Sequence, residues 1–230
     1  KIPAKLEPMT IKVDEERWFT AAHCKGVRPI ARIRKEQCDI QVREMLEQGL
    51  IVASSATAYS QVHMAQKKLG AYRFCLDYRR LNDLTATERW PVPDIPKLIG
   101  AIGARQPKYF AVMDLTKGYF QAPLAKSCRK LTAFITGEGL YEWTRVPTGL
   151  TGAPVYFQRQ MNATVFTDLM HTKCKIFMDD LIVFGKTKKE YIENLELVMQ
   201  RAREFNLTFN PKKCLFGLEK VAFVGYQIDT

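Results

Sequence analysis

The sequence contains few residues of the types that build zinc sites. Six cysteines and three histidines are scattered over 230 residues, and no two cysteines form a Cys-x-x-Cys pair. Structural zinc sites use ligands at such short spacings, so we do not expect a zinc-binding module. Widely separated cysteines instead indicate free thiols in a reducing compartment.

Long hydrophobic runs are also missing. No apolar stretch approaches the ~20 residues that cross a bilayer, so we expect no membrane partner. The opening Lys1-Ile2-Pro3-Ala4-Lys5 lacks the apolar core of a signal peptide. Because the sequence starts without Met and stops just after a strand-like segment, we expect it to be a piece of a longer protein.

The balance of charge is strongly positive. The formal net charge is +11, whereas 47% hydrophobic and 26% charged residues are ordinary for a globular protein. An excess of positive charge favours a polyanionic partner such as nucleic acid. The alternative is that the charge only aids solubility.

Two acidic sites are each attached to an apolar run. Asp114 ends the run 109–113, and Asp179–Asp180 lies between the runs 176–178 and 181–184. Such runs are typical of buried strands, and a doublet between two of them indicates the tip of a hairpin. Clustered carboxylates repel one another unless a cation binds, and oxygen ligands favour magnesium or manganese. Two such ions about 4 Å apart serve in-line phosphoryl transfer. The alternative is that these are ordinary turn aspartates.

The second half of the chain predicts a β-α-β-β-α-β unit. A strand over 109–114 precedes short strands and turns over 115–152, and Pro154 opens a helix that reaches about Met170. Two strands flank the acidic doublet, and further strands are expected from Leu207 and over 221–228. A capping box at Thr187 and Glu190 starts the clearest helix. Its apolar residues at helical spacing are Tyr191, Ile192, Leu195, Val198, Met199, Ala202 and Phe205. In such a sheet the acidic sites can lie side by side.

The first half is less regular. Residues 36–48 predict an amphipathic helix that ends at Gly49. One side of this helix carries Cys38, Val42, Met45 and Leu46. Residues 61–78 predict two strands around the basic turn 67–70. The prolines at 91, 93 and 96 indicate an extended connection.

Seven segments in register carry a resemblance to a known family. They are Arg73–Asn82, Trp90–Pro93, Met113–Gln121, Thr148–Pro154 with Phe157-Gln158, Phe177–Asp180, Asn210–Cys214 and Phe223–Tyr226. From about Val27 onward, the chain resembles the reverse transcriptases of gypsy-type LTR retrotransposons and their retroviral relatives.

The resemblance implies an α+β fold: the fingers and palm of a right-hand polymerase, with the palm a ferredoxin-like β-α-β-β-α-β sheet that carries a large insertion. The fingers would occupy 1–108, with 115–152 partly in the fingers. The palm would occupy 109–114 and 153–230 and end at the primer grip, without a thumb.

The resemblance also implies the catalytic residues. Asp114 and Asp179 would bind both metal ions, with Asp180 as a third, less directly engaged carboxylate. The carbonyl of Leu115 would add one ligand. Lys212 or Lys213 would match the lysine that protonates the leaving pyrophosphate, and Lys213 is our candidate. The alternative is that these lysines form a basic pair at a surface turn.

The nucleotide and primer sites follow in the same way. Arg73 and one of Lys67 or Lys68 would hold the incoming triphosphate, together with the backbone N–H groups of Lys117 and Gly118. Tyr119 would be the steric gate under the sugar. Thr148 and Gly149 would line the nucleotide pocket, although Thr148 stands where the family usually has a larger residue. Met178 would lie beside the primer terminus, and Val224-Gly225-Tyr226 would grip the primer. The alternatives are a core aromatic at Tyr119 and a solvated turn at Lys67 and Lys68.

We therefore expect an RNA-directed DNA polymerase that adds dNTPs to a primer on an RNA or DNA template. The resemblance implies two Mg2+ ions, or Mn2+, and a location in the cytoplasm or inside retrotransposon particles. Two alternatives stay open. A nucleic-acid-binding module that has lost catalysis would not need to keep all three aspartates. Another two-metal enzyme on the same sheet, such as a cyclase, would not need the basic hairpin or the primer-gripping strands.

Overall fold

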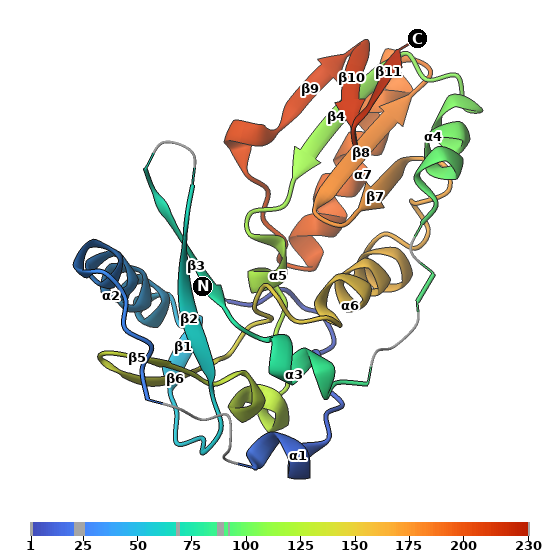
Figure 1. The fold of residues 1–230 in the computed structure, drawn as a ribbon. Coiled ribbons are helices and arrows are strands. Elements are labelled where there is room, and N and C mark those ends of the chain that lie inside the picture. Colours follow the sequence, from blue (N-terminus) through green and yellow to red (C-terminus); the bar gives the residue numbers. More distant parts are fainter. Residues whose placement is uncertain (1, 21–25, 68–69, 87–89, 92, 230) are drawn as a thin grey trace. The chain divides into compact units, whose positions relative to one another are not determined.

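Residues 2–20, 26–67, 70–86, 90–91 and 93–229 are described by a computed structural model of the chain. They divide into two units (Figure 1). Unit 1 consists of Pro8–Glu88 and Ala122–Ala153, and unit 2 consists of Ile2–Glu7, Arg89–Gln121 and Pro154–Thr230. The expected boundary at residue 108 differs from this division, because helix α4 (Ile95–Gly103) packs on the sheet of unit 2. No helix of the described residues is long and apolar enough to cross a bilayer.

Unit 1 is built on a five-stranded mixed sheet with the order β1-β6-β5-β2-β3. Its strands are β1 (Ile51–Ala53), β2 (Ser60–Gln66), β3 (Tyr72–Leu76), β5 (Phe134–Thr136) and β6 (Gly139–Trp143). Strands β2 and β5 pair in parallel, and the other pairs are antiparallel. The helices are α1 (Glu15–Phe19), α2 (Arg32–Glu47), α3 (Arg79–Asp83) and the 3-10 helix η2 (Lys126–Thr132). The two strands predicted within 61–78 are confirmed as β2 and β3.

The predicted helix at 36–48 is confirmed as α2, which begins four residues earlier. Its buried residues include Cys38, Val42 and Met45, but Leu46 is 36% exposed, so its predicted burial is wrong. Gly49 follows the helix with φ +66°, a conformation that glycine adopts without a steric penalty.

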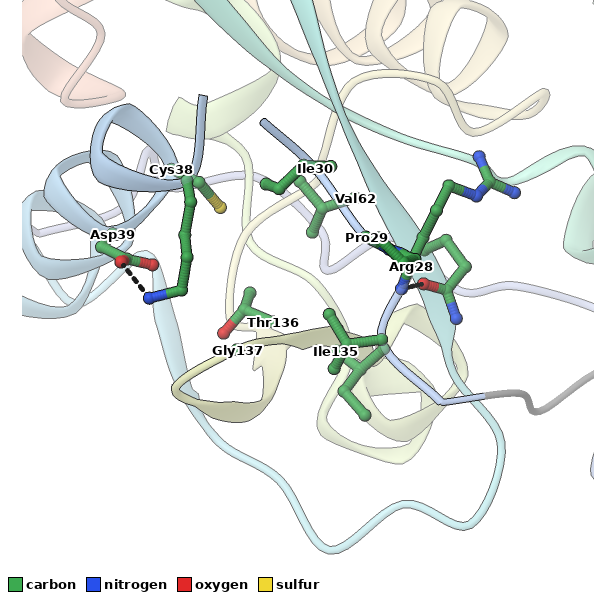
Figure 2. A pocket seen from close by; sticks show the side chains of 12 residues that line it. Arg28, Pro29, Ile30, Cys38, Asp39, Val62, Ile135, Thr136 and Gly137 are labelled. Carbon is green, nitrogen blue, oxygen red and sulfur yellow. Dashed lines mark hydrogen bonds and ion pairs between the residues drawn. The ribbon is translucent and has the colours of Figure 1, made fainter. Parts of the chain in front are cut away.

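A cavity of about 230 Å³ lies in unit 1 between α2, β2 and β5 (Figure 2). Apolar side chains such as Ile30, Val62 and Ile135 line it, and Lys35 Nζ donates to Asp39 Oδ2 at 3.2 Å beside it. Cavities that bind drug-sized ligands measure about 300–1,000 Å³. This cavity is smaller, and its buried carboxylate already has a cationic partner.

Unit 2 contains a four-stranded antiparallel sheet with the order β7-β8-β4-β9. The strands are β4 (Tyr109–Asp114), β7 (Cys174–Phe177), β8 (Asp180–Gly185) and β9 (Leu215–Leu218). Helices α6 (Ala153–Gln160), continued by the π-helix Met161–Val165, and α7 (Lys188–Glu204) complete the predicted β-α-β-β-α-β order, which is confirmed. The remaining elements are α5 (Gly118–Gln121), the 3-10 helix η4 (Pro211–Lys213), β10 (Lys220–Phe223) and β11 (Tyr226–Asp229).

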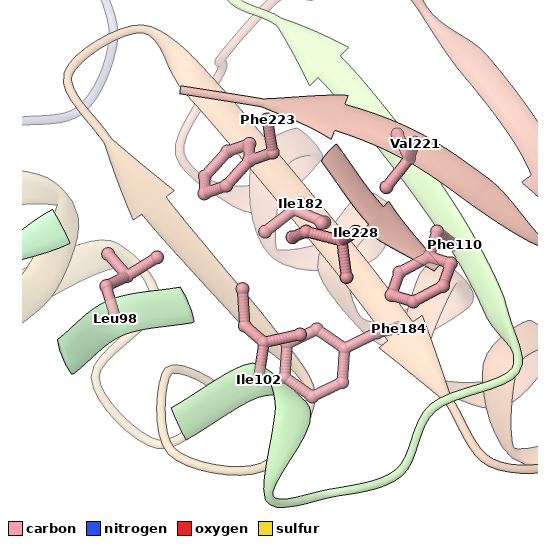
Figure 3. Close-up of a cluster of buried hydrophobic side chains, with 8 residues drawn as sticks. All are labelled: Leu98, Ile102, Phe110, Ile182, Phe184, Val221, Phe223 and Ile228. Carbon is pink, nitrogen blue, oxygen red and sulfur yellow. The ribbon is translucent and has the colours of Figure 1, made fainter. Parts of the chain in front are cut away.

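The two faces of this sheet have different covers. On one face α4 and the β10–β11 hairpin enclose an apolar cluster (Figure 3). The cluster consists of Leu98, Ile102, Phe110, Ile182, Phe184, Val221, Phe223 and Ile228. Side chains alternate between faces along a strand, so Leu181, Val183 and Gly185 face the other way. There Gly185 lies directly against the backbone of Tyr191 in α7.

Several expected boundaries in unit 2 are wrong. The helix after Pro154 ends at Val165 and not at Met170. The strand expected from Leu207 begins only at Leu215, because residues 211–213 form a 3-10 turn. Residues 221–228 are a hairpin and not one strand, since Val224 and Gly225 have positive φ angles of 49° and 81°. Pro96 lies in the first turn of α4, where its missing N–H is tolerated, and not in an extended segment.

The capping box at the start of α7 is confirmed in part. Thr187 Oγ1 accepts a hydrogen bond from the Glu190 N–H at 3.1 Å. Glu190 Oε2 accepts from the N–H of Lys186, one residue before the cap, at 2.9 Å. Of the predicted apolar face, Tyr191, Val198 and Ala202 are buried, whereas Ile192 and Met199 are each 41% exposed. Asn194 is the fourth buried residue of this helix, and its Nδ2 donates to the Phe184 carbonyl at 2.9 Å.

The contact at Gly185 gives a test of this packing. A Cβ at position 185 would lie 2.5 Å from Tyr191 N and 2.7 Å from its Cα, so Gly185→Ala must displace backbone. We expect it to lower the free energy of unfolding by about 1–3 kcal/mol. Gly100→Ala in α4, where a Cβ meets nothing within 4 Å, is the control. It should be neutral or stabilise by about 0.5–1 kcal/mol, as alanine does within helices. Equal denaturant midpoints for the two variants would contradict the described contact.

Candidate active site

The backbone of unit 2 brings the three aspartates to one end of its sheet. Asp114 is the last residue of β4 and pairs directly with Asp180, the first residue of β8. Asp179 lies in the two-residue turn between β7 and β8, and its carbonyl accepts a hydrogen bond from the Leu115 N–H at 3.0 Å. The predicted hairpin and its juxtaposition with Asp114 are therefore present.

The environment of Asp179 is unfavourable to an uncompensated charge. Its Oδ1 is buried and has no hydrogen-bond partner among the described residues. Burial, together with the neighbouring carboxylates of Asp114 and Asp180, raises the pKa of Asp179 to about 6. Burial and Asp114 also raise the pKa of Asp180. A buried carboxylate whose oxygen lacks a donor is a group that a cation would stabilise.

Lys213 places a positive charge beside the three carboxylates. Its Nζ donates to Asp114 Oδ2 at 2.9 Å, and this bond raises the pKa of the Lys213 ammonium. The Lys213 side chain is 62% exposed, and exposed ion pairs contribute little to stability. An ammonium therefore lies against the carboxylate that the family resemblance assigns to a metal ion.

The donor set fits a hard divalent cation. The carboxylates of Asp114, Asp179 and Asp180 provide the oxygen ligands that Mg2+ and Mn2+ prefer, and the buried Asp179 Oδ1 lacks a partner. As they stand, no three His, Cys, Asp or Glu side chains within the described ranges form a ready-made metal-binding group. Because the Lys213 ammonium lies on Asp114 Oδ2, a cation bound there would have to displace it or share the carboxylate with it.

The segment after β4 is fitted closely to Asp179. A Cβ on Gly118 would overlap Asp179 Oδ1 and lie 2.9 Å from its Cγ, so the carboxylate occupies the space that glycine leaves open. Lys117, which precedes it, has φ +49°. The resemblance assigned both residues to phosphate binding through their N–H groups. The packing adds a second reason for glycine at position 118.

Tyr119 is half-buried beside the turn. Its ring contacts Phe157 edge-on, with centroids 5.3 Å apart, and its hydroxyl lies 3.9 Å from Met178 Sδ. Burial, with a smaller contribution from Asp179, raises the pKa of Tyr119 to about 12. Tyr119 and Met178, which the resemblance assigned to the sugar and to the primer terminus, therefore lie next to each other.

Two glutamines that the sequence analysis did not assign to the site hold its loops. Gln121 Nε2 donates to the carbonyls of Thr116 and Thr208, each at 2.9 Å, and its Oε1 accepts from the Thr208 N–H at 2.8 Å. Gln158 bonds to the backbone of Met178 and Ile176. Both glutamines lie within segments that carried the resemblance, and this was the only feature of the sequence that could have pointed to them.

The remaining primer-grip candidates lie at the tip of the β10–β11 hairpin. Val224 and Gly225 form its turn, and Tyr226 begins β11 with 45% of its surface exposed. Asp114 lies four residues after Phe110 in β4, and Asp180 lies two residues before Ile182 in β8. Side chains an even number of residues apart point to the same face of a sheet, so the two aspartates share the face of Phe110 and Ile182. This is the face that the hairpin covers.

The other nucleotide-site candidates belong to unit 1. Arg73 lies exposed on β3, and the N–H of Lys67 donates to the Ala71 carbonyl at 2.7 Å. Lys68 lies outside the described residues. Asn82 holds the loop that contains Thr148 and Gly149: its Nδ2 donates to the Gly149 carbonyl and its Oδ1 accepts from the Thr151 N–H, each at 2.9 Å.

An ion pair between Asp77 and Arg79 lies at the end of β3. Arg79 Nη2 lies 2.7 Å from Asp77 Oδ2, and Arg28 Nη2 lies 3.8 Å from the same oxygen. The hydrogen bonds from Arg79 hold the pKa of Asp77 below its usual value.

Comparison with known proteins identifies the relatives of this chain. Residues 65–228 match the family described as reverse transcriptase (RNA-dependent DNA polymerase). The chain is 35% identical over 205 residues to the retrovirus-related Pol polyprotein from transposon 297 of Drosophila melanogaster, covering 87% of this chain and 19% of that protein. It is 30% identical over 195 residues to the corresponding polyprotein of transposon gypsy from the same organism, covering 82% and 19%. The chain thus spans about a fifth of these relatives.

Solved structures show the same fold. A prototype foamy virus protease–reverse transcriptase superposes with a TM-score of 0.83 at 23% identity, covering 99% of this chain and 30% of that one. The foamy viral protein in complex with an RNA/DNA hybrid gives a TM-score of 0.80 at 21% identity, covering 99% and 29%. The predicted α+β polymerase fold is confirmed. With the family match over most of its length, the chain belongs to the reverse transcriptase family.

Proposed function

We propose that this chain is the nucleotide-adding part of an RNA-directed DNA polymerase. It would extend a primer annealed to an RNA or DNA template with dNTPs. The observation that carries the proposal is the meeting of Asp114, Asp179 and Asp180 at one sheet end within a chain of this family. The net charge of +11 and the nucleic acid in the related foamy viral complexes support a nucleic-acid partner.

The two units correspond to the two parts of the proposed polymerase. Unit 2, with its β-α-β-β-α-β sheet and the β10–β11 hairpin, would be the palm, and unit 1, with the β2–β3 hairpin, would be the fingers. Lys67, Lys68 and Arg73 would provide positive charge for the triphosphate from unit 1. Replacing any of these three residues by alanine should raise the KM for dNTP, which tests this role.

The residues of unit 2 would have separate tasks. Asp114, Asp179 and Asp180, with the Leu115 carbonyl, would hold two magnesium ions. When bound, such ions lower the pKa of the attacking hydroxyl and stabilise the charge on the leaving oxygens. Lys213, a few ångströms from this cluster, would donate a proton to the leaving pyrophosphate. Tyr119 would exclude a ribose 2′-hydroxyl by its bulk.

The alternatives make different demands. A binding module without catalysis would bind primer–template but not extend it. A cyclase on the same sheet would consume nucleotide without any primer. Measuring nucleotide incorporation with and without primer, alongside primer–template binding, therefore separates these functions from the proposed one.

Removing the charge of Asp179 tests the site directly. We expect Asp179→Asn to lower the rate of primer extension by roughly a thousandfold, as loss of a key electrostatic group does, while primer–template affinity stays within a factor of two to three of wild type. Glu219→Gln, an exposed and equally conservative change in unit 2, is the control and should leave extension intact. Retained activity in Asp179→Asn would remove this residue from catalysis.

The close fit of Gly118 predicts a steric effect. Gly118→Ala should displace the Asp179 carboxylate and reduce extension at least tenfold, because a misplaced catalytic group is costly. Gly103→Ala, where a Cβ meets nothing within 4 Å, should extend at the wild-type rate. Steady-state extension assays compare the two, and equal rates would refute the packing account of Gly118.

The size of Tyr119 predicts sugar selectivity. Tyr119→Val should lower the ratio of kcat/KM for dNTP over rNTP by at least tenfold, because one missing steric clash is worth about 1–3 kcal/mol. Tyr119→Phe keeps the ring and should keep the selectivity. A gate is excluded if the valine variant discriminates between the sugars as well as wild type does.

A further inference from the structure

The buried amide of Gln158 lies against the turn that presents Asp179. Gln158 is 1% exposed and belongs to α6. Its Oε1 accepts a hydrogen bond from the Met178 N–H at 2.7 Å, and its Nε2 donates to the Ile176 carbonyl at 3.1 Å. One side chain thus bonds to the end of β7 and to the turn that follows it.

The backbone of this turn is strained. Met178 has φ +54°, which costs a residue with a side chain roughly 1–2 kcal/mol. Only Met178 and Asp179 connect Phe177, the last residue of β7, to Asp180, the first of β8. A relaxation of Met178 would therefore act directly on Asp179, its neighbour in this two-residue turn.

The helix holds Gln158 in a single orientation. Its Nε2 also donates to Asn162 Oδ1 at 3.0 Å, four residues along and within the π-helix Met161–Val165. With one bond to the Ile176 carbonyl and one to Asn162, both amide hydrogens are used. Exchanging the oxygen and nitrogen of the amide would place a donor against the Met178 N–H. The network therefore specifies which atom faces the turn.

We propose that Gln158 is a positioning residue that holds Met178 in its left-handed conformation and so fixes the direction of the Asp179 carboxylate. Losing this part-buried hydrogen bond would cost free energy, since the N–H of Met178 would lose its partner on the buried Gln158 side chain. The catalytic consequence of this role rests on the proposed polymerase function. The hold on the turn does not, and can be measured without it.

Gln160 provides a matched control. It lies two residues away in the same helix and is 3% exposed, and its Oε1 has no hydrogen-bond partner in the described part of the chain. A Gln→Leu change at either position removes a buried amide of the same size. Only the change at position 158 removes a bond to the turn.

The test is the hydrogen exchange of the Met178 amide. The chain has eight methionines, so selective 15N-methionine labelling gives a simple spectrum. In Gln158→Leu we expect the Met178 amide to exchange roughly tenfold faster than in wild type, the effect of losing one hydrogen bond. Gln160→Leu should leave this rate unchanged. Gln158→Glu keeps an oxygen acceptor and should fall between wild type and Gln158→Leu.

A second readout connects the turn to the site. In calorimetric titrations with Mn2+, Gln158→Leu should bind the metal about tenfold more weakly than Gln160→Leu. In primer extension, it should lower kcat while the KM for primer–template stays at the wild-type value. If Gln158 only stabilised the fold, both leucine variants would have the same lowered thermal midpoint. Their Mn2+ affinities and their kcat values would then be equal.

The outcomes separate the inference from the proposed function. Faster Met178 exchange and weaker Mn2+ binding in Gln158→Leu alone would support the positioning role, even if the wild-type chain extends no primer and the polymerase proposal fails. Equal Met178 exchange in Gln158→Leu and Gln160→Leu would overturn the positioning role, even if wild-type extension is robust.

Discussion

Repulsion among three carboxylates is the constraint on which the acidic end of the unit 2 sheet depends. The register of β4 and β8 sets Asp114 directly opposite Asp180, and the turn before β8 adds Asp179 beside them. Neighbouring charge and burial raise the pKa of Asp179 to about 6. Positive charge nearby relieves this repulsion; Lys213 supplies it in this structure, and divalent cations would supply it under the proposed function.

The surrounding fold keeps these groups together through apolar packing and through hydrogen bonds to the backbone, and not through ion pairs alone. Apolar packing of α4 and the β10–β11 hairpin buries one face of the sheet, and α7 closes on the other at Gly185. The glutamines at 121 and 158 then fix the two loops that leave the sheet at the acidic end. Rigid strands thus set the position of Asp114 and Asp180, while hydrogen bonds from neutral side chains set that of Asp179.

Much of this arrangement could be predicted from the sequence. Apolar runs beside Asp114 and Asp179–Asp180 gave the central strands and their hairpin, since burial on both faces leaves a clear signal. The glutamines could not be predicted in the same way, because their partners are backbone groups up to 87 residues away. The strand expected from Leu207 was wrong because only Phe209 pairs there, in an isolated bridge to Leu115, before the 3-10 turn at Pro211. Leu46 and Ile192 follow helical spacing yet are exposed. Spacing shows which residues share one side of a helix, but it does not show how much of that side a neighbouring element covers.

The central claim is that Asp114 and Asp179 jointly hold a divalent cation when primer–template is bound. The most direct test is anomalous scattering from Mn2+ in crystals of the chain with a primer–template. The account predicts a Mn2+ peak bonded to both carboxylates, with the Lys213 ammonium displaced from Asp114 or sharing it with the ion. A peak elsewhere, or no peak while Lys213 stays on Asp114, would contradict it.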